Sequence, residues 1–242
     1  MMISTHRSSQ DRFATTRWSV VMHMAASPET DAGDALTELA QRYWFPVYAY
    51  LRRCGHAPAL AQEIAGAFLQ RLLRQFRDGE ATAPRGHFRR FLLAQLNAFL
   101  AGDWRENTEQ PEARNLLPPV ELETRYRTEL IDSGSPEDAY QRSFALEVLA
   151  RAIKRLGSEA NRAGHQDMFD ALMPFLGNEP TPGVLDALAP SLHTRPLALL
   201  VALKRLRQRF RELVGEELAD TVTNSEELAA ENAALHAVLR GA

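Results

Sequence analysis

Hydrophobic residues recur every three or four positions along most of this 242-residue chain, which is the period of an amphipathic helix. The clearest predicted helix covers residues 60–76, and its apolar face is formed by Ile64, Phe68, Leu72 and Phe76. Another predicted helix covers residues 88–104. No segment alternates apolar and polar residues as a half-buried strand does. The pattern therefore predicts an all-α protein.

Turn and capping residues divide the first half into further predicted helices. Thr15 or Thr16 caps a first helix that runs to Met22. Asp34 opens a second helix, and Pro46 is expected to interrupt or kink it, because proline lacks the backbone N–H that a helix interior needs. The second half is predicted to contain helices near 137–157, 162–176, 180–190 and 195–214.

Composition changes over residues 107–134, which are rich in proline and charge and favour a linker with one short helix near Leu122–Leu130. Asn224 and Glu227 form a capping box for a last helix. The chain is therefore predicted to have four parts: a helical domain (1–106), the linker (107–134), a second helical domain (135–218) and an acidic C-terminal helix (219–242).

Charge is unevenly distributed, although the net charge of −3 on its own argues against a nucleic-acid binder. Residues 71–105 hold seven arginines against three acids, and residues 195–211 hold six basic residues and no acid. Residues 212–231 hold seven acids and no base. The two basic segments predict either two anion-binding faces or merely solvated helix faces, and charge alone leaves both interpretations open.

Several classes of protein are not expected. No run of eighteen apolar residues predicts a membrane span, and the polar residues 1–11 lack the apolar stretch of a secretory leader. The single cysteine, Cys54, cannot form an intramolecular disulfide, which fits a cytoplasmic location. The sequence contains no glycine-rich phosphate loop and no Cys/His set with metal spacing, so we expect no catalysis, metal or cofactor.

Three segments carry a resemblance to a known family. Residues 36–56, LTELAQRYWFPVYAYLRRCGH, resemble region two of extracytoplasmic-function (ECF) RNA polymerase sigma factors, closest to a subgroup that opens with a phrase like FATTRWSVV at 13–21. Residues 85–100, RGHFRRFLLAQLNAFL, are similar to the next stretch of that region. Residues 202–213, ALKRLRQRFREL, resemble the last helix of the region-four helix-turn-helix. The likeness keeps its order along nearly the whole chain.

The resemblance implies two helical domains on a flexible linker. The first would bind the clamp helices of core RNA polymerase and open the minus-ten promoter DNA, and the second would hold the polymerase flap and read the minus-thirty-five element. Contacts to the minus-ten DNA are expected from Arg85, His87, Arg89, Arg90, Asn97, Trp104 and Arg105. Contacts to the minus-thirty-five DNA are expected from Arg195, Lys204, Arg205, Arg207, Gln208 and Arg211. Polymerase contacts are expected from Arg52, Arg53, Gln62, Glu63 and Arg71.

The aromatic residues of this region have two possible roles. Phe88, Phe91 and Phe99 lie on the apolar stripe of their helix, so we expect them to pack in the core. Trp104 at the helix end, beside Arg105, is the better candidate for stacking on an extruded base.

Two segments depart from the family pattern. Residues 57–68 keep only Gln62 and Glu63 where the family has acids and amides for the clamp. In the helix predicted over 195–214, Leu197, Leu200 and Val201 face outward where polar base-reading side chains are expected. The turn before that helix, Leu192 to Pro196, also lacks the glycine of most relatives. An outward apolar patch more often marks a protein contact.

Two functions therefore stay open. The first is an ECF-type sigma factor that needs an activating partner or modification, with an anti-sigma factor or a kinase as its regulator. The second is a degenerate sigma-like adaptor that works through protein contacts. The acidic tail likewise has two interpretations: it is a solvated helix, or it folds over the basic 195–211 segment and competes with DNA.

Overall fold

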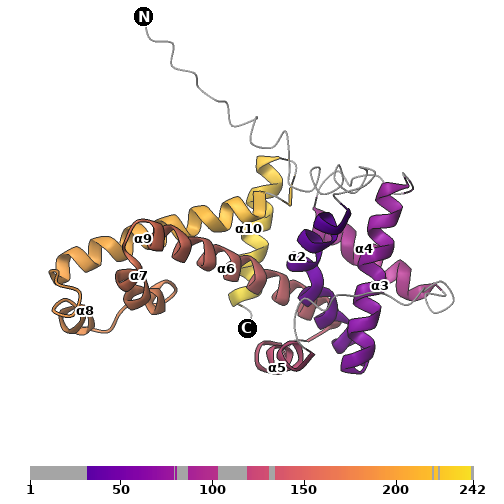
Figure 1. Ribbon diagram of the computed structural model, residues 1–242, viewed down its shortest axis with the longest axis horizontal. Coiled ribbons are helices and arrows are strands. Elements are labelled where there is room, and N and C mark those ends of the chain that lie inside the picture. The colour runs from indigo at the N-terminus through magenta and orange to yellow at the C-terminus, as the bar shows by residue number, and fades with distance from the viewer. Residues whose placement is uncertain are drawn as a thin grey trace, which may run out of the picture. The chain divides into compact units, whose positions relative to one another are not determined.

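The computed structural model describes residues 32–78, 80, 87–102, 119–130, 134–219, 221–222 and 224–240. Within these residues the chain forms helices and no strand, which confirms the predicted all-α class (Figure 1). The helix predicted after Thr15 lies outside the described residues. The chain divides into two compact units: unit 1 is residues 1–147 with 218–242, and unit 2 is residues 148–217.

Unit 1 contains most of the helices. They are α2 (Ala32–Arg53), α3 (Pro58–Arg77), α4 (Phe88–Ala101), α5 (Pro119–Glu129), the start of α6 (Pro136–Arg162) and α10 (Ser225–Arg240). Helix α3 packs against α2, α4 and α5. The linker helix predicted near Leu122–Leu130 exists as α5, and Leu122 and Leu130 are fully buried, so this helix is part of the packed unit.

Aromatic side chains fill the core of unit 1. Tyr43 is fully buried, and its ring centroid lies 5.5 Å from that of Phe88 and 5.7 Å from that of Phe144. Phe99 is buried, and Phe91 lies 5.9 Å from Phe88. Such contacts add to the burial of apolar area. The prediction that the phenylalanines of α4 pack in the core is therefore confirmed.

Pro46 lies inside α2, which continues through it from Ala32 to Arg53. A proline in a helix interior removes a backbone hydrogen bond and costs about 3 kcal/mol. Every residue from 42 to 51 is buried, so the burial of this stretch offsets that cost. Of the two predicted effects of Pro46, the interruption does not occur, and the kink stays a prediction.

Unit 2 contains the rest of α6, α7 (Gln166–Leu172), a single 3₁₀ turn η2 (Met173–Phe175), α8 (Val184–Leu188) and α9 (Pro196–Ala219) up to residue 217. The predicted boundary near residue 157 was wrong, because α6 continues through Gly157 to Arg162. A Cβ atom at Gly157 would lie 3.1 Å from the Phe169 ring, so the glycine allows close packing of α7. The turn after α6 contains Gly164 with φ +73°.

The turn between α8 and α9 contains His193 with φ 48°. This left-handed conformation favours glycine, which the sequence lacks here, and costs another residue about 1 kcal/mol. The turn therefore has the backbone conformation that glycine favours, and the presence of the His193 side chain makes this conformation strained. The helix predicted over 180–190 is limited to Val184–Leu188, because Gly183 at its start also has positive φ, 85°.

Candidate functional site

Helix α9 presents a two-part exposed face. Leu199 and Leu203 are buried, as the periodicity predicts. Leu197, Leu200 and Val201 are 71%, 50% and 45% exposed, which confirms that the first turns of α9 expose apolar side chains. Further along the same face, Lys204, Gln208 and Arg211 are exposed. The face is therefore apolar near its N-terminus and cationic toward its middle.

Four of the six predicted minus-thirty-five contacts are basic side chains that are exposed to solvent. They are Arg195, Lys204, Arg205 and Arg211, and none has a carboxylate partner among the described residues. The guanidinium of Arg211 donates to Gln208 Oε1 at 2.8 Å, and Gln208 donates to Glu212 at 3.1 Å. A long flexible cation on an exposed helix face is suited to a phosphate oxygen.

Arg207, by contrast, is bound to a loop of its own chain. Its guanidinium donates to the Phe175 carbonyl at 2.9 and 3.0 Å and to the Asn178 carbonyl at 2.7 Å, and it forms an ion pair with Glu179 at 2.6 Å. Phe175 is the last residue of η2 and Asn178 lies in the loop after it, so Arg207 supplies donors to carbonyls at a helix end. Arg207 thus ties the loop after η2 to α9, and its donors are directed at that loop and not at an open surface.

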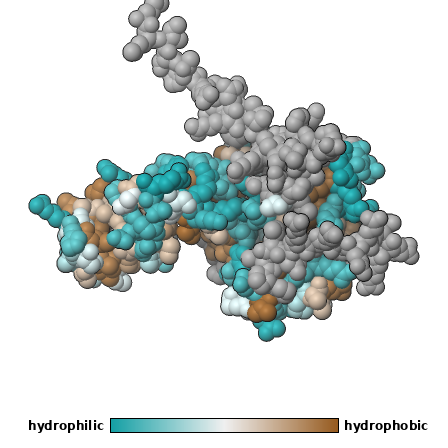
Figure 2. Space-filling view, in the orientation of Figure 1, coloured by the Kyte–Doolittle hydropathy of each residue, from teal (hydrophilic) through white to brown (hydrophobic). Residues whose placement is uncertain are grey.

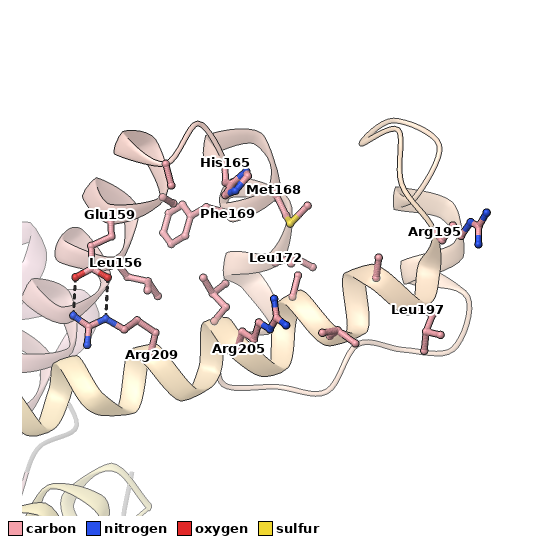
Figure 3. A pocket seen from close by; sticks show the side chains of 16 residues that line it. Leu156, Glu159, His165, Met168, Phe169, Leu172, Arg195, Leu197, Arg205 and Arg209 are labelled. Atoms are coloured by element: carbon pink, nitrogen blue, oxygen red, sulfur yellow. Dashed lines mark hydrogen bonds and ion pairs between the residues drawn. The ribbon is translucent and has the colours of Figure 1, made fainter. Parts of the chain in front are cut away.

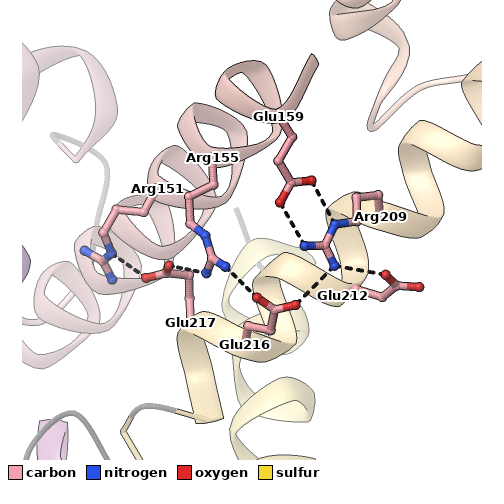
Figure 4. A network of polar contacts seen from close by, with 7 residues as sticks. All are labelled: Arg151, Arg155, Glu159, Arg209, Glu212, Glu216 and Glu217. Atoms are coloured by element: carbon pink, nitrogen blue, oxygen red, sulfur yellow. Dashed lines mark hydrogen bonds and ion pairs between the residues drawn. The ribbon is translucent and has the colours of Figure 1, made fainter. Parts of the chain in front are cut away.

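The C-terminal half of α9 is joined to α6 by ion pairs within unit 2 (Figure 4). Arg209 contacts Glu159 at 2.8 Å and Glu216 at 3.1 Å, and the hydrogen bond to Glu159 raises the pKa of Arg209. Glu217 is 2% exposed and accepts from Arg151 at 3.0 Å and from Arg155 at 2.9 Å. Part of the acidic segment 212–231 therefore neutralises arginines of its own unit.

A groove of about 760 Å³ lies within unit 2, between α7 and the first half of α9 (Figure 3). Its apolar lining includes Phe169 and Leu172 of α7 and Leu197 and Val201 of α9, and Arg205 lies at its edge. Apolar patches interrupt the hydrophilic surface of this unit at the end that carries α7 and α8 (Figure 2). The volume and lining suit an apolar side chain or helix face of a ligand.

In unit 1, Arg89 of α4 is buried and paired with a carboxylate of α10. Arg89 is 6% exposed, and its Nε lies 2.6 Å from Glu231 Oε2. The other oxygen of Glu231 lies 2.5 Å from His87 Nδ1, a close contact without hydrogen-bond geometry. Glu231 is 2% exposed. Two of the predicted minus-ten contacts, Arg89 and His87, thus hold a residue of this same chain.

The remaining predicted minus-ten residues differ in exposure. Arg90 is exposed with no partner among the described residues. Asn97 is exposed, and its Oδ1 accepts from Tyr50 at 2.6 Å. Burial raises the pKa of Tyr50 to about 12, so its hydroxyl stays a donor. The other three, Arg85, Trp104 and Arg105, lie outside the described residues.

Arg52, a predicted polymerase contact, is engaged by α5. Its guanidinium donates to both carboxylate oxygens of Glu123 at 2.9 Å, and Tyr48 donates to the same carboxylate at 2.8 Å. The hydrogen bond from Arg52 is the main cause that lowers the pKa of Glu123 to about 2. A bidentate pair of this kind fixes α5 on α2. The guanidinium is therefore turned toward this chain.

The other four predicted polymerase contacts differ in how exposed their side chains are. Arg53 donates to the Gly134 carbonyl at 2.8 Å, and Gln62 is buried. Glu63 and Arg71 are exposed, and Arg71 lies 5.6 Å from the centroid of the Phe99 ring. Two of the five residues therefore offer open polar surface.

The position of Glu231 had a signal in the sequence that we had not used. Leu228, Glu231 and Leu235 are spaced by three and four residues, so a carboxylate interrupts the apolar stripe of α10. A charged residue on such a stripe predicts a buried partner of opposite charge. The partner, Arg89, lies 142 residues away and is not marked by any local pattern.

Further comparisons identify no relative. Among the described residues, no group of three or more His, Cys, Asp or Glu is arranged to hold a metal ion, and no helix has the length and apolar character needed to cross a membrane. The chain matches no protein-family model, and no curated protein or solved structure is detectably similar to it. The resemblance to ECF sigma factors stays a prediction from the quoted residues.

Proposed function

We propose that this chain is an ECF-type sigma factor that recruits core RNA polymerase to promoters in the cytoplasm. The observation that carries the proposal is α9. It follows a short helix and a tight turn, as the last helix of a helix-turn-helix does, and it exposes Lys204, Arg205 and Arg211, with Arg195 exposed just before its first residue. In this proposal unit 2 belongs to a region-four-like domain, and the α2–α4 bundle, with α5 packed on it, belongs to a region-two-like domain.

The proposed contacts of α9 divide along the helix. The cationic middle grips the phosphates of the minus-thirty-five DNA, and the apolar first turns join the unit 2 groove as the surface for the polymerase flap. Leu197 is 71% exposed and also lines the groove, which supports a protein contact at this end. Phosphate contacts position a protein on DNA without specifying sequence. Base reading is therefore expected to be weak and polymerase binding important.

Binding to purified core polymerase tests this assignment. Leu197→Asp places a charge in the proposed interface and is expected to weaken the affinity for immobilised core by roughly tenfold or more. Val120→Asp makes the same chemical change at a site in unit 1 that is 76% exposed, so it should change the affinity less than about twofold. Equal affinities of the two variants, or no binding by the parent chain, would contradict the assignment.

A degenerate sigma-like adaptor is the second candidate. It is favoured by Leu197, Leu200 and Val201, which are apolar where a base-reading helix needs polar groups. Both candidates bind a protein through this surface, and they differ in DNA opening. Permanganate reactivity of thymines in promoter DNA, measured with core polymerase present, separates them: a sigma factor produces reactive thymines and an adaptor does not.

A further inference from the structure

The anion site on α4 is filled by a residue of the same chain. Arg89 and His87 hold the two oxygens of Glu231 at 2.6 and 2.5 Å, and the carboxylate is 2% exposed. The Arg89 contact is a charge-assisted hydrogen bond, and His87 lies at ion-pair distance from the second oxygen. A phosphate oxygen has the same requirement, so Glu231 occupies a position in which a nucleic-acid phosphate would be bound.

Arg89 also has contacts within unit 1 that do not involve α10. The hydroxyl of Tyr140 donates to the Arg89 carbonyl at 3.0 Å, and the guanidinium lies 5.7 Å from the centroid of the Phe144 ring. Both aromatic residues belong to α6, within unit 1. The guanidinium thus has one neighbour, the Phe144 ring, that does not belong to α10.

Helix α10 buries little apolar surface. Among its described side chains, Leu235 is the only buried apolar one. The buried pair of Glu231 with Arg89 is therefore a main attachment of this helix to unit 1. Exchange of the Glu231 carboxylate for a phosphate leaves Arg89 paired, so opening in the presence of DNA avoids the large cost of an uncompensated buried charge.

We propose that α10 is an autoinhibitory latch, in which Glu231 occupies the Arg89–His87 anion site until a phosphate of single-stranded DNA replaces it. The proposal deepens the proposed function and rests on it for the biological role of the DNA. It also differs from the sequence hypothesis about the tail, because the latch covers α4 and not the basic 195–211 segment. The carboxylate competes with DNA for the same two donors.

Binding of a fluorescein-labelled single-stranded oligodeoxynucleotide tests the competition. Glu231→Gln removes the competing charge and is expected to lower the Kd by roughly tenfold. The slope of log affinity against log salt should steepen by about 0.7, the value for one more phosphate contact on a single strand. The matched control is Glu226→Gln, which makes the same charge change at an exposed position of α10. Equal gains from both variants overturn the latch, because the effect is then long-range charge.

Hydrogen exchange of the unaltered chain gives a second, independent test. The amides of residues 225–240 are expected to exchange faster when the oligonucleotide is bound than in the free protein. Unchanged exchange at saturating DNA overturns the latch even if Glu231→Gln unfolds unit 1. If the oligonucleotide opens α10 but the chain never initiates transcription with core polymerase, the proposed function fails and the latch stands. If transcription occurs and Glu231→Gln leaves it and the DNA affinity unchanged, the latch alone fails.

Discussion

Helices α4 and α9 carry the two basic segments of the sequence, yet they use their cations differently. On α4, Arg89 is buried against a carboxylate from α10, and Arg90 beside it is exposed. On α9, Lys204 and Arg205 are exposed without carboxylate partners among the described residues, and Arg207 is bound to a loop. The number of arginines in a segment therefore does not give the number of cations available to DNA.

The difference in exposure between these arginines arises from the groups that each one contacts, because the side chain itself is the same. A guanidinium that is buried beside a carboxylate contributes to the fold, and its loss leaves the partner charge without compensation. An exposed guanidinium contributes little to stability and is free to contact phosphate. Adjacent residues on one helix should thus respond in opposite ways to substitution, and four predictions follow in order of expected effect.

The largest effect is expected from Arg89→Ala, which leaves Glu231 buried without its main partner. The free energy of unfolding of unit 1 should fall by about 3–5 kcal/mol. Arg90→Ala changes an exposed residue of the same type and should cost less than about 0.5 kcal/mol. Urea unfolding followed by tryptophan fluorescence reports on unit 1, because Trp44 is buried there and residues 148–217 contain no tryptophan. Similar losses of unfolding free energy in Arg89→Ala and Arg90→Ala would show that burial beside a carboxylate does not separate the two arginines.

Arg207 and Arg205 make the corresponding comparison on α9. Arg207→Ala removes the donors for the carbonyls of Phe175 and Asn178 and should destabilise unit 2 by about 2 kcal/mol. Arg205→Ala should leave stability unchanged and lower the affinity for duplex DNA in a salt-dependent way. Unfolding followed by far-ultraviolet circular dichroism, with DNA affinity measured in parallel, checks both. A DNA defect confined to Arg207→Ala would reverse their assigned roles.

Arg52 extends the distinction to the predicted polymerase surface, and pH tests it. The pKa of Glu123 is about 2 in the folded chain against an ordinary value of 4.5, so its contribution is complete above about pH 5 and is lost as the pH falls toward 2. Glu123→Gln should therefore reduce the loss of unit 1 stability between pH 5 and pH 3. Glu121→Gln, an exposed change on the same helix, should leave the pH profile unaltered. Urea unfolding midpoints of both variants, measured between pH 5 and pH 3, test this. Equal pH profiles of Glu123→Gln and the parent chain would contradict the assigned role of Glu123.

The smallest effect is expected at the turn that leads into α9. His193→Gly relieves the left-handed backbone and should stabilise unit 2 by about 1 kcal/mol, less the entropy that glycine adds to the unfolded chain. Thr194→Gly changes a neighbour that is not in a left-handed conformation and should be destabilising. Thermal unfolding by circular dichroism measures both. A loss of stability in His193→Gly would show that the turn is unstrained.

Sequence patterns predicted the helices well where burial follows the period, as in α3 and the outward Leu197 and Leu200 of α9. They failed at Gly157, where packing against another helix overrides a local preference, and only the kink remains open of the two effects predicted for Pro46. The candidate site was less predictable, because the partner of a basic residue is set by the tertiary fold. Nothing near Arg89 in the sequence marks it as the partner of Glu231.

The most direct test of the central claim is transcription in vitro from genomic DNA of the source organism. Purified core polymerase is supplied with and without the chain, and with the Glu231→Gln variant, and the 5′ ends of the transcripts are sequenced. We expect a new set of start sites that share upstream elements near minus ten and minus thirty-five, with more transcript from the variant. Identical start sites with core alone, with the chain and with the variant would contradict the assignment of this protein as a sigma factor.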